Sequence, residues 1–218
     1  MMGNRGGRLH DAQRKLSNRR WTSKQWICCK LEFNDRHRAV WGDSYTELFF
    51  LDEVTALAAG HRPCFECRRK DAETFATLFA GAGSLSARPR ESGDPGQTLV
   101  APVTAALDSR LRGNERSAGL RHRASAAMMD TALHAERLSG KAKRLHRRAI
   151  DTLPGGAMIV LGGEVFAVRG ERLLPWTPSG YGPARPRPHA QEVEVLTPPS
   201  ILAVLARGYG PQWHPSAA

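Results

Sequence analysis

The stretch ELFFLDEVTALAAGHRPCFECRRKDAETF, residues 47–75, constrains the fold more than any other part of the chain. It sets Cys64 and Cys67 two residues apart, between two segments with the pattern of helices. Asp52 is a suitable N-cap for the first helix, which is expected to end at Gly60 before the proline that follows. A C-x₂-C at the start of a second helix lets two thiolates bind one tetrahedral metal ion, and the first helical amides favour the thiolate form. The spacing therefore predicts half of a zinc site.

Cys28 and Cys29 are the only other cysteines of the chain, so they are the candidates for further zinc ligands. They lie in KQWICCKLEF, a predicted strand in which Cys29 shares a face with Ile27 and Leu31 while Cys28 points the other way. One of the two cysteines is expected to be the third ligand, and the fourth is open between the other one and the histidines His61, His37 and His10. The alternative for all four cysteines is that they are reduced thiols of the core.

Residues 46–67, TELFFLDEVTALAAGHRPCFEC, resemble the second half of the Ada-type zinc-binding domain, which stands at the front of the bacterial adaptive-response protein that repairs methylphosphotriesters in DNA. The family pattern is NxxFFxxxxxALAAGFRPCxxC. The chain departs from it at Thr46 and His61 and agrees with it, without a gap, at Phe49, Phe50, Ala56, Leu57, Ala58, Ala59, Gly60, Arg62, Pro63, Cys64 and Cys67. The resemblance implies zinc at Cys64 and Cys67.

The first half of the family pattern has no counterpart in this chain. Ada-type domains carry two further ligands as C-x₃-C, and one of that pair accepts the methyl group. Cys28 and Cys29 are adjacent and do not have this spacing. The resemblance therefore does not transfer methyl acceptance residue by residue.

The net charge of +11 is concentrated in two regions. Residues 1–30 hold eight basic residues and one acidic residue, and residues 84–150 hold thirteen basic and six acidic residues. Clustered Lys and Arg bind polyanions by releasing counterions from phosphates, which predicts DNA as a partner. The candidate contacts are Arg62, Arg68 and Arg69 beside the cysteines, and Arg144, Arg147 and Arg148 on one face of a helix expected within residues 141–150. The alternative is a basic surface that is merely solvated.

The expected fold class is α+β, with a small antiparallel sheet, helices and a C-terminal β-meander. The small sheet is expected to surround a zinc knuckle, the C-x₂-C turn of residues 64–67. Residues 1–82 form the zinc-knuckle region, and within them residues 3–20 are expected to be a polar arm that orders against the body or a partner. Residues 83–120 are expected to be a disordered insert, and RPRESGDP and LDSRLRGNER within them resemble a translated bacterial repeat element. Residues 121–218 are expected to hold a helical pair and the meander.

Several classes of protein are disfavoured. No run of eighteen apolar residues and no apolar signal segment is present, so neither a membrane span nor a secretory signal is expected. Four cysteines in so long a chain predict reduced thiols and a cytoplasmic location. Nucleophile elbow, P-loop, dinucleotide and paired-histidine zinc motifs are missing from the sequence, which leaves the question of enzymatic activity open.

The leading hypothesis is a zinc-binding protein that contacts DNA. A second hypothesis is a cysteine methyl acceptor in phosphotriester repair, with Cys28 or Cys29 as the zinc-bound nucleophile. A third is a module in which zinc only stabilises the fold and the basic surface binds a protein. Nothing in the sequence fixes the oligomeric state.

Overall fold

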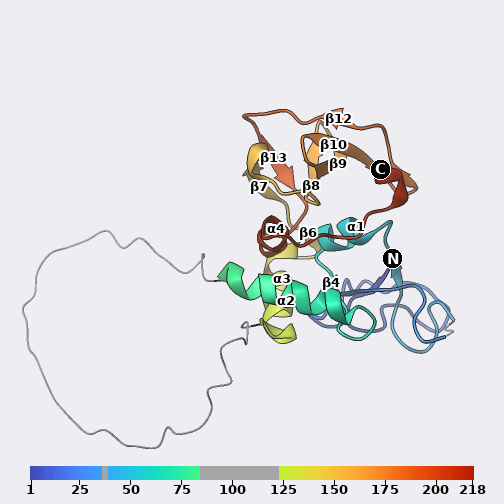
Figure 1. Ribbon diagram of the computed structural model, residues 1–218. Coiled ribbons are helices and arrows are strands. Elements are labelled where there is room, and N and C mark those ends of the chain that lie inside the picture. The colour runs from blue at the N-terminus through green and yellow to red at the C-terminus, as the bar shows by residue number, and fades with distance from the viewer. Residues whose placement is uncertain (36–38, 84–122) are drawn as a thin grey trace, which may run out of the picture.

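The computed structural model describes residues 1–35, 39–83 and 123–218, and these form an α+β fold, as the sequence predicts (Figure 1). The N-terminal part combines a small sheet with helices, and the C-terminal part is a larger antiparallel sheet. Of the expected insert, only Gly83 belongs to the described residues, and the rest of residues 83–120 lies outside them.

The small sheet has four strands in the order β3-β1-β2-β4. They are β1 (Met2–Asn4), β2 (Ile27–Cys29), β3 (Leu48–Phe49) and β4 (Arg62–Pro63). β1 runs antiparallel to β2 and β3, but β2 and β4 are parallel, so the sheet is mixed, whereas the sequence predicts an antiparallel one. The polar arm was expected to begin at residue 3. Residues 3 and 4 belong instead to β1, an inner strand whose backbone pairs with β2 on one side and β3 on the other.

The two helices around the cysteines are where the sequence predicts them. α1 is Glu53–Ala58 and α2 is Arg69–Gly83. The carboxylate of Asp52 caps α1 by accepting a hydrogen bond from the Thr55 amide at 2.9 Å. Gly60 has φ +84°, the left-handed conformation that ends the segment, and the chain then enters β4.

The helical pair expected in residues 121–150 is half right. α3 (Ala126–Arg137) is present, but residues 138–149, all of which the structure describes, form no second helix. The chain instead forms the β5–β6 hairpin (Leu138–Ser139 and Ala142–Lys143) and β7 (His146–Ala149). Gly140 makes the turn with φ +59°, and pairing of β7 with a strand of the large sheet overrides the helical pattern. Arg144, Arg147 and Arg148 therefore do not share a helix face, and Arg147 and Arg148, as neighbours on a strand, point to opposite sides.

The C-terminal sheet confirms the expected meander. Its seven strands have the order β11-β10-β9-β8-β13-β7, with β12 paired to β10. A 3-10 turn, Ile150–Thr152, links β7 to the meander. The remaining strands are β8 (Met158–Leu161), β9 (Glu164–Arg169), β10 (Arg172–Thr177), β11 (Gly180–Tyr181), β12 (Arg185–Pro186) and β13 (Glu192–Val195). Helix α4 (Pro199–Ala206) and a 3-10 turn at Pro215–Ala217 end the chain.

Helix α4 lies between the two parts and is buried by both (Figure 1). Ile201 and Val204 belong to an apolar cluster with Leu57 of α1 and Phe75 of α2, whereas Leu202 belongs to the core of the large sheet. This shared helix packs the sheet against the cysteine-bearing part. No helix within the described residues combines the length and apolar character needed to cross a membrane.

The start of α1 adds a polar connection between the two parts. The Glu53 carboxylate accepts hydrogen bonds from the Tyr209 hydroxyl at 2.7 Å and from the Gln212 amide at 2.9 Å. The Asp52 carboxylate accepts one from the Tyr181 hydroxyl at 2.8 Å. These carboxylates fix the C-terminal segment next to the helix that precedes the cysteines.

Candidate metal centre

Three cysteines, Cys29, Cys64 and Cys67, come together in the N-terminal part. Their sulfur atoms all lie within 4.8 Å of one another, and Cys29 and Cys64 are buried. Zinc holds thiolates at about 2.3 Å, which places the sulfurs of a tetrahedral site roughly 3.8 Å apart. The cluster is therefore compact enough to close on one ion with small side-chain movements.

Backbone pairing explains why these three side chains meet. The parallel register of β2 and β4 places Cys28 opposite Pro63, and the Cys64 amide donates to the Cys28 carbonyl at 3.1 Å. Cys29 at the end of β2 is thereby brought beside the knuckle. The knuckle is itself closed by the Arg68 amide, which donates to the Cys64 carbonyl at 3.1 Å.

The three thiols share negative charge unequally. A hydrogen bond from Cys29 lowers the pKa of Cys64 to about 5 against the effect of burial, and the amides of Cys67 and Glu66 assist. The same hydrogen bond, together with burial, raises the pKa of Cys29, and burial raises the pKa of Cys67. Without a cation the cluster therefore holds its charge mainly on Cys64. A bound divalent cation would allow all three cysteines to be deprotonated, because its positive charge stabilises three thiolates.

Cys28 is not part of the cluster. Its side chain is fully buried, and its sulfur accepts a hydrogen bond from Arg68 Nη1 at 3.4 Å. Burial raises the pKa of the Cys28 thiol to about 12. Of the two strand cysteines, only Cys29 faces the knuckle, as expected if the knuckle packs on the face with Ile27 and Leu31.

Two of the three histidines expected as fourth ligands, His10 and His61, lie in other surroundings. His10 has both ring nitrogens within hydrogen-bond distance of other groups, Thr46 Oγ1 at 2.6 Å and the Gly42 carbonyl at 2.9 Å. His61 is fully buried against the rings of Trp26 and Phe50, and burial holds its pKa well below the usual value. Neither joins the cluster. His37 lies outside the described residues.

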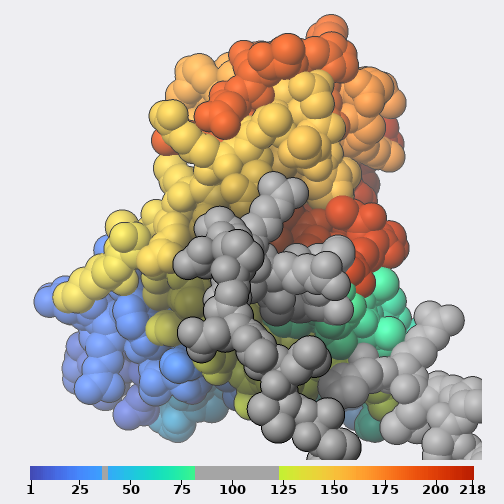
Figure 2. Space-filling model, turned by 90° about the vertical axis from the view of Figure 1, so that its left-hand side faces the viewer, coloured from blue at the N-terminus to red at the C-terminus, as the bar shows by residue number. Residues whose placement is uncertain are grey.

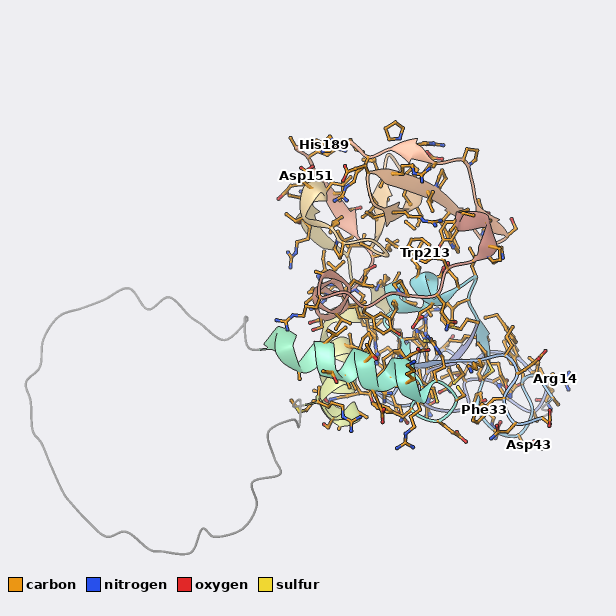
Figure 3. The ribbon with its side chains drawn as sticks, in the orientation of Figure 1. Arg14, Phe33, Asp43, Asp151, His189 and Trp213 are labelled. Carbon is orange, nitrogen blue, oxygen red and sulfur yellow. The ribbon has the colours of Figure 1, made fainter. Side chains whose placement is uncertain are left out.

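A pocket of about 690 Å³ opens beside the cysteines. The three cluster thiols line it together with polar residues and with apolar residues that include Ile27, Leu31, Phe33, Val40 and Phe49. Figure 3 shows Phe33 in the N-terminal part, well away from the C-terminal sheet. The cluster therefore borders a space large enough for a small molecule. The alternation along the predicted strand places Leu31 on the face of Cys29, but no pattern in the sequence indicated that Val40 and Phe49 would join it.

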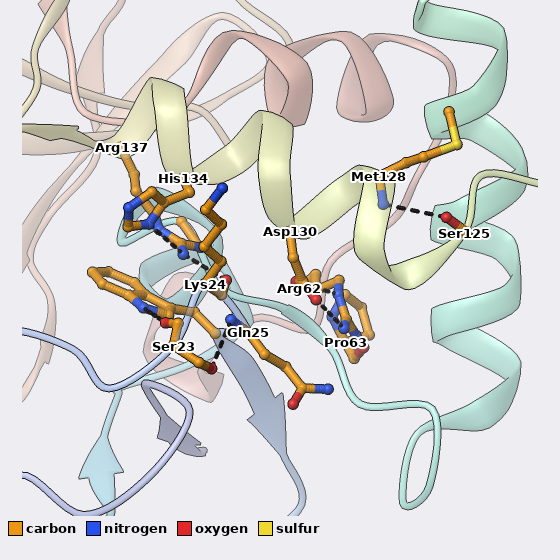
Figure 4. Close-up of polar contacts among 12 residues, drawn as sticks. Ser23, Lys24, Gln25, Arg62, Pro63, Ser125, Met128, Asp130, His134 and Arg137 are labelled. Atoms are coloured by element: carbon orange, nitrogen blue, oxygen red, sulfur yellow. Dashed lines mark hydrogen bonds and ion pairs between the residues drawn. The ribbon is translucent and has the colours of Figure 1, made fainter.

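The arginines beside the cysteines have internal partners. Arg62 makes two hydrogen bonds of 2.8 Å to the Asp130 carboxylate of α3, and its side chain is almost completely buried (Figure 4). Arg68 is equally buried and pairs with Glu53 at 2.7 Å and Asp71 at 2.8 Å. In this arrangement neither guanidinium is presented to a phosphate backbone. The sequence analysis did not predict these carboxylate partners. The one available signal was that Asp130 directly follows Met129, a core residue of α3.

The other expected DNA contacts are exposed. Arg69 has a side chain 78% exposed and lies 3.4 Å from Glu73 within α2. Arg144, Arg147 and Arg148 are also exposed, on and just before β7. The structure thus leaves these four residues accessible but spreads them over separate elements.

No family model, no curated protein and no solved structure matches the chain. The resemblance to the Ada-type zinc-binding domain therefore stays a prediction that rests on residues 46–67. The part of it that coincides with the geometry is the pair Cys64 and Cys67, which Cys29 completes to a candidate three-thiolate metal site.

Proposed function

We propose that the protein binds a zinc ion through the thiolates of Cys29, Cys64 and Cys67. The observation that carries this proposal is the convergence of three sulfurs from β2 and the knuckle within 4.8 Å. Thiolates are soft ligands that select zinc and other thiophilic ions over magnesium or calcium. A tetrahedral zinc held by three protein ligands keeps a fourth position for another ligand, and in this protein the site borders a pocket.

Metal content and matched cysteine variants test this proposal. We expect the purified protein to retain about one zinc per chain after exhaustive dialysis, and Cys29→Ser and Cys64→Ser/Cys67→Ser to lose it. Cys28→Ser is the control, because Cys28 neighbours the site without joining it. Zinc retained by the double variant, or lost equally from the control, contradicts the proposed ligand set.

DNA contact is a second candidate function, supported by a basic surface. Figure 2 shows part of the N-terminal segment, in blue, close to the segment that follows α3, in yellow. Exposed cations of these segments include Arg19, Arg20, Lys24, Lys141 and Arg144. The end of α3, which leads into the hairpin, contacts the N-terminal segment: Arg137 donates to the Lys24 carbonyl at 2.7 Å, and the ring of Trp21 packs edge-on against that of His134 at 5.3 Å. None of the five cations forms an ion pair with a residue that the structure describes.

Salt-dependent binding to duplex DNA tests this second candidate. Charge reversal of Arg20, Lys24 and Arg144 should weaken binding to any sequence and lower the salt slope by about 0.9 for each phosphate that the protein no longer neutralises. Reversal of Arg172 and Arg185 on the large sheet is the control at a separate basic site. Equal effects of the two sets, or no DNA binding, leave the zinc site in a structural or protein-binding role.

A third candidate function is methyl acceptance by a cysteine of the metal cluster. Complete burial of Cys28 and its raised pKa argue against that cysteine as a nucleophile, whereas Cys29 lines the pocket. A zinc-bound thiolate stays nucleophilic at neutral pH. Incubation with a methylphosphotriester duplex followed by peptide mass analysis decides this point: a methyl increment on Cys29 supports the activity, and an unmodified cluster excludes it for this substrate.

A further inference from the structure

The pocket beside the cysteines has an apolar wall that metal binding alone does not explain. Leu31 is 64%, Val40 51% and Phe49 60% exposed, and all three line the pocket. They are half of the six large hydrophobic residues that are exposed in the described part of the chain. A contiguous patch of exposed apolar side chains often marks a binding surface, whereas apolar residues exposed singly are ordinary.

The same pocket reaches the metal site. Cys29 and Cys64, only 8% and 7% exposed, form part of its lining. Its volume of about 690 Å³ lies within the range of small-molecule sites, roughly 300–1,000 Å³. One molecule can therefore contact the metal with one end and the apolar wall with its body.

The donor set restricts which end can bind. Three thiolates give a zinc complex a net charge of about −1, so the ion is electron-rich and a weak Lewis acid. Such an ion favours a soft fourth ligand, sulfur or imidazole nitrogen, over a carboxylate or alcohol oxygen. A thiol binds as the thiolate and releases its proton to solvent, whereas a neutral imidazole binds without releasing one.

We propose that this pocket binds a small organic molecule that carries a thiol or imidazole donor on an apolar body. The donor takes the fourth position of the zinc, and the body packs against Leu31, Val40 and Phe49. The proposal rests on the proposed zinc site and adds to it the chemical class of the ligand.

Cobalt-substituted protein provides the test, because Co²⁺ reports its own coordination. Sulfur-to-cobalt charge-transfer absorption measures whether the cluster holds the ion, and the visible d–d bands measure whether a fourth ligand enters. The probes are two pairs with the same donor, 2-phenylethanethiol with 2-mercaptoethanol and 4-phenylimidazole with imidazole. Because the phenyl members bury apolar area on the wall, we expect them to bind about tenfold more tightly than their partners.

Wall variants assign this preference to the pocket. Phe49→Ser and, separately, Leu31→Ser should reduce the preference for the phenyl member severalfold and leave the affinity of the short donor nearly unchanged. Both side chains are mostly exposed, so folding should tolerate the changes. Met128→Ser and Leu145→Ser are the matched controls, because these residues are exposed, apolar and outside the pocket lining.

The three ways in which the test can fail are distinguishable. Stoichiometric cobalt with thiolate charge transfer but d–d bands that no probe alters overturns the ligand proposal and leaves the metal site standing. Equal affinities within each pair, or a preference that survives both wall variants, also overturns it. Absence of thiolate charge transfer contradicts the metal site itself.

Discussion

Removing the Asp130 carboxylate should destabilise the protein severely, because it leaves a buried charge without its partner. Both Asp130 oxygens accept hydrogen bonds from Arg62 at 2.8 Å, and the two side chains are 10% and 1% exposed. Breaking such a buried pair from one side costs about 3–5 kcal/mol. For a chain of this size that corresponds to a fall in Tm of roughly 10 °C, at about 2–4 °C per kcal/mol. Asp130→Ala should show this fall in thermal and urea unfolding followed by circular dichroism.

Two further variants separate the charge effect from general damage. Glu73→Ala breaks exposed pairs with Arg69 and Arg123 and should cost at most about 1 kcal/mol. Arg62→Met/Asp130→Leu removes both charges and should recover much of the stability, because an apolar pair replaces the ion pair. If Asp130→Ala is as stable as Glu73→Ala, or if the double variant is less stable than Asp130→Ala, the buried charge is not what makes the pair important.

Three smaller perturbations follow from contacts around the site. Gly60→Ala should cost about 2 kcal/mol or more in chemical denaturation, because Gly60 has φ +84° and an added Cβ would lie 2.7 Å from Arg137 Cδ. Tyr209→Phe should lower the free energy of unfolding by about 1.5 kcal/mol, since it removes a buried hydrogen bond to the Glu53 carboxylate at 2.7 Å; an unchanged urea midpoint would disprove that role. Burial lowers the pKa of Lys143 to about 8. Because the unfolded chain then binds more protons than the folded one between pH 8 and the ordinary lysine pKa, this residue should make stability rise with pH in that window, and Lys143→Met should flatten the rise measured by urea unfolding.

Local signals in the sequence were enough to predict the segment that carries the cysteines. The Asp52 cap, the Gly60 stop and the C-x₂-C spacing each depend on neighbouring residues, and each is where it was predicted. The alternation of side chains along β2 also separated Cys29 from Cys28. These features need no knowledge of distant contacts.

Features that depend on distant partners were not predictable in the same way. Residues 141–150 have a helical pattern, but β7 pairs with β13 more than forty residues later and becomes an edge strand of the large sheet. Arg62 and Arg68 looked like phosphate contacts because charged residues are usually exposed, whereas Asp130 and Glu53 bury them. The pocket wall likewise needs Phe49 of β3 beside Leu31, which no sequence periodicity relates.

X-ray absorption at the zinc edge counts the sulfur ligands of the bound ion, and so it decides whether three thiolates hold the metal. For wild-type protein with one zinc per chain, we expect three sulfur neighbours at about 2.3 Å and one lighter neighbour near 2.0–2.1 Å. Cys28→Ser should leave this spectrum unchanged, and Cys29→Ser should remove a sulfur or the metal. In wild-type protein dialysed free of small thiols, four sulfurs, or a first shell of nitrogen and oxygen alone, would contradict the three-thiolate site of Cys29, Cys64 and Cys67.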